Sequence, residues 1–368
     1  MVRYRHSLGE ELTLKKNKIH ALLTSYGIII KAKLSDIGVI IIAFRRKTYI
    51  VEAIRSVLEQ VVNGVTYQIT IVKNFLDKEI DEFINENGLN NIYTDNFSLG
   101  YKILLGTILT NSPVICLLED DDMFSKNKIN NVYIRFNKNN RLIYYHNSMT
   151  PINEEGNKIM KWYKQENKTV LYNDFSNLKT MLRIIKYGGH NLSSISISRN
   201  LILNNVKMFI DSTYALDYGM LLLAFSSGKS LLSDGEELTY YRVHNSAIHI
   251  VNAEYTEFIN NKRQLSDGEI ETLHNLNKFI DANNKDLVNI YHLMLYQHLL
   301  RRSFITFSTS NISLIEYIGL SKYAYNIKDY VKYIPLIFLQ PKMLGKFKNN
   351  LIKIYIKNFL LKRSMSTR

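Results

Sequence analysis

Short apolar runs that alternate with stretches of helical periodicity constrain the fold of this chain most strongly. Val39–Ala43 and Val114–Leu118 are continuous apolar segments of strand length, and Ile69–Val72 is a shorter one between them. In the intervals, apolar residues recur at helical spacing over residues 50–61 and 99–109. Strands that are buried on both faces and separated by helices predict a parallel sheet covered by helices. We therefore expect an α/β fold of the nucleotide-binding kind.

The pattern changes along the second half of the chain. Leu142–His146 and Ser193–Ser198 have the character of further strands, whereas strand signals fade after residue 250 and segments such as Leu287–Phe304 are typical of helices. We therefore expect a mainly helical C-terminal region. The predicted parts are an N-terminal extension, a sheet domain and this helical region, at residues 1–35, 36–250 and 251–368.

The charge of the chain indicates an anionic partner. Among 368 residues, 47 Lys and Arg face 33 Asp and Glu, which gives a formal net charge of +14. A phosphate-bearing substrate, a phospholipid surface and nucleic acid all fit this charge. No nucleic-acid-binding module is recognisable in the sequence, so nucleic acid is not expected as a partner.

Cysteine usage and hydropathy indicate a cytoplasmic protein. The single cysteine, Cys116, lies within an apolar run and has no second cysteine for an internal disulfide, as is usual in a reducing compartment. The polar start of the chain does not resemble a secretory signal. No apolar run approaches the roughly 20 residues that a membrane-spanning helix needs.

The last part of the chain is basic and amphipathic. Every charged residue between Gln340 and Arg368 is Lys or Arg, and Lys346–Lys362 mixes lysines with Leu, Ile and Phe. Such a segment can lie in the interface of an anionic membrane, which predicts peripheral association with the inner face. The alternative is a C-terminal helix that packs on the sheet domain and keeps its lysines in solvent.

An acidic cluster carries the strongest chemical signal. Glu119, Asp120, Asp121 and Asp122 follow directly on the apolar run Val114–Leu118. In open α/β sheets, ligands bind beyond the carboxyl ends of the strands. Adjacent carboxylates repel one another, and Mg²⁺ or Mn²⁺ bound by one or two of them together with phosphate oxygens relieves that repulsion. The alternative is that Asp122 caps a helix starting near Phe124 while its neighbours are solvated.

In these motifs the sequence resembles the family 2 glycosyltransferases, which have a GT-A fold, from about Ile37 to Ser246. The first motif, Val39–Arg46, corresponds to the family's nucleotide pocket, which implies that Ala43, Phe44 and Arg45 bind the donor. The second is the acidic cluster. By the resemblance, Asp120 contacts the donor ribose, Asp121 holds the metal ion and Asp122 supports the metal site.

The third motif lies later in the chain. Ala215–Tyr218 resembles the family's second acidic motif, and Leu238–Ser246 resembles its Tyr-Arg-x-His segment. The resemblance places Asp217 where the catalytic base is found and His244 near the donor diphosphate and the metal ion. The alternative for Asp217 is an acid favoured by a helix N-terminus, and the alternative for His244 is a structural histidine.

The resemblance implies an inverting glycosyltransferase. Such an enzyme moves a sugar from a nucleotide-sugar donor to a hydroxyl group of a glycan or lipid-linked acceptor, with Mg²⁺ or Mn²⁺ and an Asp general base. A nucleotidyltransferase is disfavoured, because Phe44–Lys47 stands where its glycine-rich phosphate loop is expected. A non-catalytic protein that binds sugar nucleotides or nucleic acid is the remaining alternative.

Two positions depart from the family pattern and leave the donor's base open. Lys73-Asn74-Phe75 replaces the acidic pair after the second strand, where Asn74 can hydrogen-bond a base edge and Lys73 can contact a phosphate. The family's Arg-Asn pair before the metal strand is also missing. Lys102 is expected to supply the lost positive charge, although as a point charge and not as a bidentate group.

Overall fold

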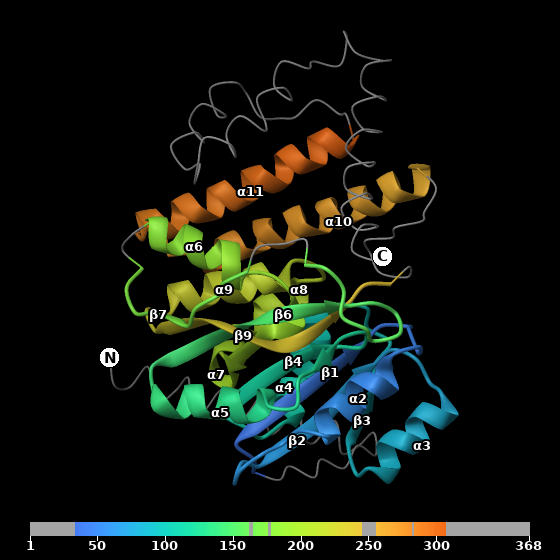
Figure 1. Ribbon diagram of the computed structural model, residues 1–368. Coiled ribbons are helices and arrows are strands. Elements are labelled where there is room, and N and C mark those ends of the chain that lie inside the picture. Colours follow the sequence, from blue (N-terminus) through green and yellow to red (C-terminus); the bar gives the residue numbers. More distant parts are fainter. Residues whose placement is uncertain (1–33, 162–164, 176–177, 245–254, 282, 307–368) are drawn as a thin grey trace.

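The computed structural model describes residues 34–161, 165–175, 178–244, 255–281 and 283–306 (Figure 1). The basic segment at 346–362, for which membrane association is predicted, and nearly all of the N-terminal extension at 1–35 lie outside these residues. In the described part of the chain, no helix combines the length and apolar character that crossing a membrane requires.

The first half of the described chain forms parallel strands separated by helices, as predicted. Strands β1, β2, β3 and β4 lie in the order β3-β2-β1-β4, all parallel, and the apolar runs expected as strands fall in β1, β2 and β4 (Figure 1). The predicted α/β class is therefore confirmed. The elements are β1 (Ile37–Ala43), α2 (Ile50–Leu58), β2 (Tyr67–Lys73), α3 (Lys78–Glu86), β3 (Asn90–Tyr93), α4 (Leu99–Leu109) and β4 (Val114–Glu119).

The second half extends the same sheet with mixed pairing. Strand β8 pairs antiparallel to β4, and β6, β9 and β5 follow in that order, with β7 paired to β9. The sheet is therefore mixed and not wholly parallel. The elements are β5 (Met123–Phe124), α5 (Lys128–Lys138), β6 (Leu142–Ile152), β7 (Val170–Tyr172), α6 (Leu178–Gly188), the 3₁₀ turn η1 (Leu192–Ser194), β8 (Ile195–Ser198), α7 (Arg199–Leu203), α8 (Val206–Asp211), α9 (Leu216–Ser226) and β9 (Ser230–Arg242).

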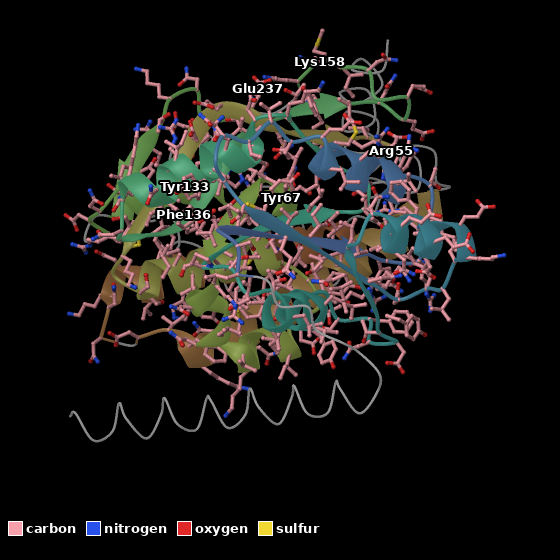
Figure 2. All side chains as sticks on the ribbon, turned by 90° about the horizontal axis from the view of Figure 1, so that it is seen from below. Arg55, Tyr67, Tyr133, Phe136, Lys158 and Glu237 are labelled. Atoms are coloured by element: carbon pink, nitrogen blue, oxygen red, sulfur yellow. The ribbon has the colours of Figure 1, made fainter. Side chains whose placement is uncertain are left out.

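Alternate residues of the buried strands belong to two hydrophobic cores, one on each face of the sheet. In β1, Ile40 and Ile42 join one core while Val39 and Ile41 join the other. This division follows from the two-residue period of a strand that is buried on both faces. One core packs under α2, α3 and α5, where Tyr67, Tyr133 and Phe136 lie at its partly exposed margin (Figure 2).

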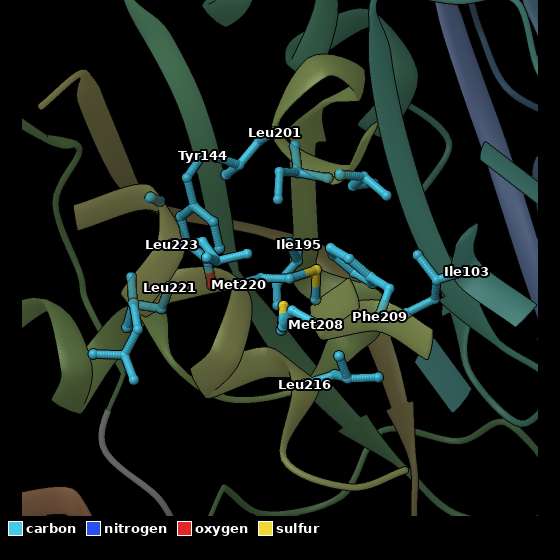
Figure 3. Packing of buried hydrophobic residues seen from close by; sticks show 14 of the residues in the cluster. Ile103, Tyr144, Ile195, Leu201, Met208, Phe209, Leu216, Met220, Leu221 and Leu223 are labelled. Carbon is cyan, nitrogen blue, oxygen red and sulfur yellow. The ribbon is translucent and has the colours of Figure 1, made fainter. Parts of the chain in front are cut away.

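The other core extends into the helices that follow the sheet. Met208, Phe209, Leu216 and Met220 of α8 and α9 pack beside Ile195 of β8 (Figure 3). Within residues 255–281 and 283–306, the structure has the helices α10 (Tyr255–Leu276) and α11 (Lys285–Thr306) and the 3₁₀ turn η2 (Asn277–Phe279), and the predicted helical character is confirmed for them. Leu273 and Leu276 of α10 belong to this same core, so these helices pack directly on the sheet domain.

Candidate active site

The predicted donor and metal residues gather at the carboxyl ends of neighbouring strands. Phe44 and Arg45 follow β1, Asn74 follows β2, and Asp120 follows β4. Because β1, β2 and β4 are parallel and adjacent, their carboxyl ends share one edge of the sheet. His244 reaches this edge from the end of β9, where its ring nitrogen Nε2 lies 2.9 Å from Asp121 Oδ2.

Arg46 lies at the centre of the acidic cluster. Its Nη2 is 2.7 Å from Asp120 Oδ1, and its Nη1 is 2.8 Å from Asp121 Oδ2. His244 Nε2 lies 3.0 Å from the same Nη1. Sequence reasoning did not assign a role to Arg46, because its neighbours in the chain are also basic and nothing in the pattern singled it out.

Asp122 is buried behind this ion-pair network and is held by Arg242. The backbone N–H of Arg242 donates to Asp122 Oδ1 at 2.9 Å, while Asp122 Oδ2 is buried and has no hydrogen-bond partner. The alternative in which Asp122 caps a helix near Phe124 is wrong. Met123 and Phe124 form the short strand β5, and α5 begins at Lys128 with Asn127 as its N-cap residue.

Burial and crowding of like charges shift the pKa values of these carboxyl groups. Burial raises the pKa of Asp120 to about 6 and that of Asp122 to about 8, and the charge of Asp121 adds to both increases. Burial would also raise the pKa of Asp121, but the hydrogen bond with His244 and the charge of Arg46 outweigh it and lower that pKa. Asp121 is therefore the member of the cluster best stabilised as an anion.

Side chains from two neighbouring strand ends hold the loop after β1 by hydrogen bonds to its backbone. The backbone N–H of Phe44 donates to Asp120 Oδ2 at 3.1 Å, and the backbone N–H of Arg45 donates to Asn74 Oδ1 at 2.9 Å. Lys102 is buried beneath the loop, where its Nζ donates to the carbonyl of Ala43 at 3.0 Å and lies 4.4 Å from the centre of the Phe44 ring. Burial lowers the pKa of Lys102 to about 8, against the raising effect of Asp120.

Two exposed aromatic rings lie at this loop: Phe44 belongs to the loop, and Phe97 lies beside it. Phe44 and Phe97 are 46% and 47% exposed, and their ring centres are 5.6 Å apart in an edge-to-face arrangement. The Arg45 guanidinium carbon lies 4.5 Å from the centre of the Phe97 ring. Sequence reasoning missed Phe97, although an aromatic residue directly before the helix-capping Ser98 is a signal that could have found it.

Lys73 does not have the arrangement that a phosphate contact requires. Its side chain is almost fully buried, with Nζ 2.6 Å from Asp81 Oδ1 and donating to the carbonyl of Phe75 at 3.0 Å. The interpretation of Lys73 as a phosphate contact is therefore disfavoured, and Asn74 is the residue of this pair that contacts the loop after β1. Asn74 Nδ2 is a buried donor without a hydrogen-bond partner.

Asp217 lies in the first turn of α9, as the helix N-terminus alternative also anticipated. The preceding Ala215 has a φ of 53°, in the left-handed region, and Asp217 Oδ1 accepts a hydrogen bond from the backbone N–H of Tyr218 at 2.9 Å. Burial raises the pKa of Asp217 to about 7; the Tyr218 hydrogen bond opposes this shift, and the charge of Glu269 on α10 adds to it.

The segment before Asp217 packs against the helix that starts beside Phe97. The carbonyl of Ser212 accepts hydrogen bonds from Ser98 Oγ at 2.9 Å and from the backbone N–H of Gly100 at 3.1 Å. A Cβ atom on Gly100 would lie 2.1 Å from the carbonyl oxygen of Phe209, so this close approach requires glycine. These contacts attach the α8–α9 connection to the same end of the sheet as the loop after β1.

Comparison with known proteins identifies the class. Residues 38–191 match the family model described as Glycosyl transferase family 2. This segment is similar in sequence to the family 2 glycosyltransferases, and the chain is a glycosyltransferase with a mixed α/β sheet. The matched segment includes the loop after β1 and the acidic cluster, whereas Asp217 and His244 lie beyond it.

The chain is distantly similar in structure to TarS from S. aureus. The structure of TarS 1–349 in complex with UDP-GlcNAc is 15% identical, with a TM-score of 0.48, and the match covers 82% of each chain. The complex with UDP is 14% identical, with a TM-score of 0.47, covering 82% of this chain and 81% of TarS 1–349. No curated protein matches the chain in sequence.

Proposed function

We propose that the chain is an inverting glycosyltransferase that moves a sugar from a nucleotide-sugar donor to a hydroxyl group of a glycan or lipid-linked acceptor, assisted by a divalent metal ion. The observation that carries this proposal is the buried acidic cluster at the carboxyl edge of the sheet. There Asp120 supports the Phe44 backbone, Asp121 is held as an anion, and Asp122 keeps a buried oxygen without a partner.

The loop after β1 would bind the nucleoside of the donor. Aromatic faces bind bases by stacking, and the half-exposed rings of Phe44 and Phe97 offer such faces beside the loop. Asn74 Nδ2 is a buried donor without a partner, which suits a base with a carbonyl oxygen on its edge. Asp120 would contact the ribose from the neighbouring strand end.

The residues present fit a divalent metal ion. Among the described residues, no group of three or more His, Cys, Asp or Glu side chains is arranged to hold a metal. Mg²⁺, however, is usually bound through one or two carboxylates plus substrate phosphates, and Asp121 and Asp122 can supply these. Family 2 glycosyltransferases generally use a divalent ion. Its chemistry in such a site is to neutralise charge on the departing diphosphate.

Asp217 would act as the general base. The acceptor oxygen forms a bond to the anomeric carbon while the bond from that carbon to the diphosphate oxygen breaks, and Asp217 accepts the acceptor's proton. Direct displacement by the acceptor inverts the anomeric configuration. A carboxyl group whose pKa is raised to about 7 is well matched to this role near neutral pH.

A scan of nucleotide-sugar donors tests the proposed function. The protein is mixed with each donor, an alcohol acceptor series and Mn²⁺ or Mg²⁺, and the released nucleoside diphosphate is measured; UDP-GlcNAc is a suitable first donor. We expect one donor to give metal-dependent release that increases with acceptor concentration. If donors bind but no acceptor supports release, the protein is a sugar-nucleotide-binding protein without transferase activity.

Replacing Phe97 with Ala tests the proposed base platform. Loss of a stacked aromatic ring costs about 1–3 kcal/mol per base, so we expect a rise of about fivefold to a hundredfold in the donor Kd. Because Phe97 is half exposed, the stability of the fold should change little. Calorimetric titration with the nucleoside diphosphate measures the change.

Leu171→Ala is a matched control, since Leu171 is 43% exposed on β7. An unchanged Kd in Phe97→Ala would place the base elsewhere.

A further inference from the structure

The guanidinium of Arg46 is a counter-cation built into the acidic cluster. Its two terminal nitrogens lie 2.7 Å from Asp120 Oδ1 and 2.8 Å from Asp121 Oδ2, so one side chain bridges two consecutive carboxylates. A planar guanidinium can do this because its N–H groups form a fork, which an ammonium group lacks. The Arg46 side chain is 26% exposed, while Asp120 and Asp121 are 3% and 15% exposed.

The local backbone directs Arg46 toward the cluster. Arg45 has a φ of 58°, in the left-handed region that residues with a side chain rarely adopt. The hydrogen bond from its N–H to Asn74 Oδ1 holds it there, and the N–H of Arg46 then donates to the carbonyl of Phe44 at 2.7 Å. Strained backbone that surrounding contacts hold in place is common at functional sites. This tight turn directs Arg45 toward Phe97 and Arg46 toward the aspartates.

Arg46 contacts one of the two carboxylate oxygens through which Asp121 can coordinate a metal ion. Asp121 Oδ2 already lies within hydrogen-bond distance of both Arg46 Nη1 and His244 Nε2. A carboxylate oxygen has only two lone pairs, so further coordination through this oxygen requires one of these partners to leave. Arg46 is the more exposed of the two, because the His244 side chain is 1% exposed. The guanidinium is therefore the partner that can move.

We propose that Arg46 competes with the divalent metal ion for Asp121, so that the metal binds weakly until a nucleoside diphosphate is present. This inference rests on the proposed function, because it concerns the same metal and donor site. When the metal takes the carboxylate, the released guanidinium needs an anionic partner, and the diphosphate of the donor supplies one. Metal and diphosphate then strengthen each other's binding, as reciprocal linkage requires.

The test measures Mn²⁺ affinity in the full chain without reference to turnover. Titration calorimetry, or the electron paramagnetic resonance signal of free Mn²⁺, gives the Kd with and without UDP. We expect Arg46→Met to bind Mn²⁺ about tenfold or more tightly than the unsubstituted protein in the absence of UDP, because a competing cation is gone. Addition of UDP should tighten Mn²⁺ binding in the unsubstituted protein by more than it does in Arg46→Met.

Arg55→Met is the matched control, since Arg55 is an arginine on α2 whose guanidinium carbon lies 5.6 Å from the centre of the Phe83 ring. Its Mn²⁺ affinity should equal that of the unsubstituted protein. Equal Mn²⁺ affinity in the unsubstituted protein and Arg46→Met overturns the inference and leaves the metal site standing. Absence of Mn²⁺ binding in both proteins overturns the inference together with the metal part of the proposed function.

A conservative variant keeps the test valid if Arg46→Met does not fold. Arg46→Lys retains one positive charge but cannot bridge both carboxylates, so its Mn²⁺ affinity should lie above that of the unsubstituted protein and below that of Arg46→Met. An affinity for Arg46→Lys equal to that of the unsubstituted protein would show that the bridge does not restrain metal binding, and would overturn the inference.

Discussion

Asp217→Asn is expected to lose turnover by about a hundredfold to ten-thousandfold, the range that general base catalysis supplies, while donor binding is retained. The amide has nearly the shape of the carboxylate and can still accept a hydrogen bond from Tyr218 N–H, but it cannot take up the acceptor's proton. Release of nucleoside diphosphate measures turnover, and calorimetric titration measures the donor Kd. Turnover within a few-fold of the unsubstituted protein would remove Asp217 from the base role.

The same variant is expected to fold, and pH supplies a second readout. The pKa of Asp217 is raised to about 7 in the folded chain, so the folded state favours the protonated form. The stability that this group contributes is therefore present at low pH and is lost as the pH rises through about 7. Asn is neutral throughout, so at about pH 8 the variant should be at least as stable as the unsubstituted protein.

The activity of the unsubstituted protein should have the opposite dependence on pH. A base must be deprotonated to work, so kcat/KM should fall as the pH decreases through about 7, the pKa of Asp217. Asp267→Asn is a suitable control, because the Asp267 side chain is 42% exposed and pairs with Arg263 one turn away on α10 at 3.8 Å. The control should keep full turnover and the same pH profile.

The sequence predicted the fold best where every residue of a strand is buried. The run Val39–Ala43 has an apolar residue at every position, and only a strand with both faces covered requires that, so β1 and its partner β4 could be predicted closely. The acidic cluster could be located for the same reason. Carboxylates that directly follow such a strand must lie at the carboxyl edge of the sheet.

Features that depend on distant partners could not be predicted. The segment Ser193–Ser198 has the alternation of a strand, but its antiparallel pairing with β4 and β6 is decided by contacts across the chain, and its first residues form the 3₁₀ turn η1. Lys73 similarly has no local signal for its ion pair with Asp81. The direction of Arg46 depends on the left-handed conformation of Arg45, which residue types alone do not reveal.

Arg242→Met is expected to lower the free energy of unfolding by about 3 kcal/mol, because it removes the charged hydrogen bonds that a fully buried guanidinium donates. The fully buried guanidinium donates to the carbonyl oxygens of Asp121 at 3.0 Å and Glu154 at 2.5 Å, and to Glu52 Oε2 at 2.6 Å. It also lies 4.4 Å from the centre of the Tyr49 ring. Met keeps much of the apolar stem and removes these donors. Urea denaturation measures the change through the midpoint and slope.

Two controls separate the possible causes of this loss. Glu52→Gln should cost less than about 1 kcal/mol, because a half-exposed ion pair contributes little and the amide still accepts a hydrogen bond. Arg263→Met, which breaks an exposed pair on α10, should change stability by less than about 0.5 kcal/mol. Since the Arg242 side chain holds the backbone of Asp121, its loss should also weaken donor binding under conditions where the variant is folded, although the backbone N–H that donates to Asp122 is kept. Full donor affinity in folded Arg242→Met would show that the acidic cluster keeps its geometry without this arginine, and that Arg242 stabilises the fold alone.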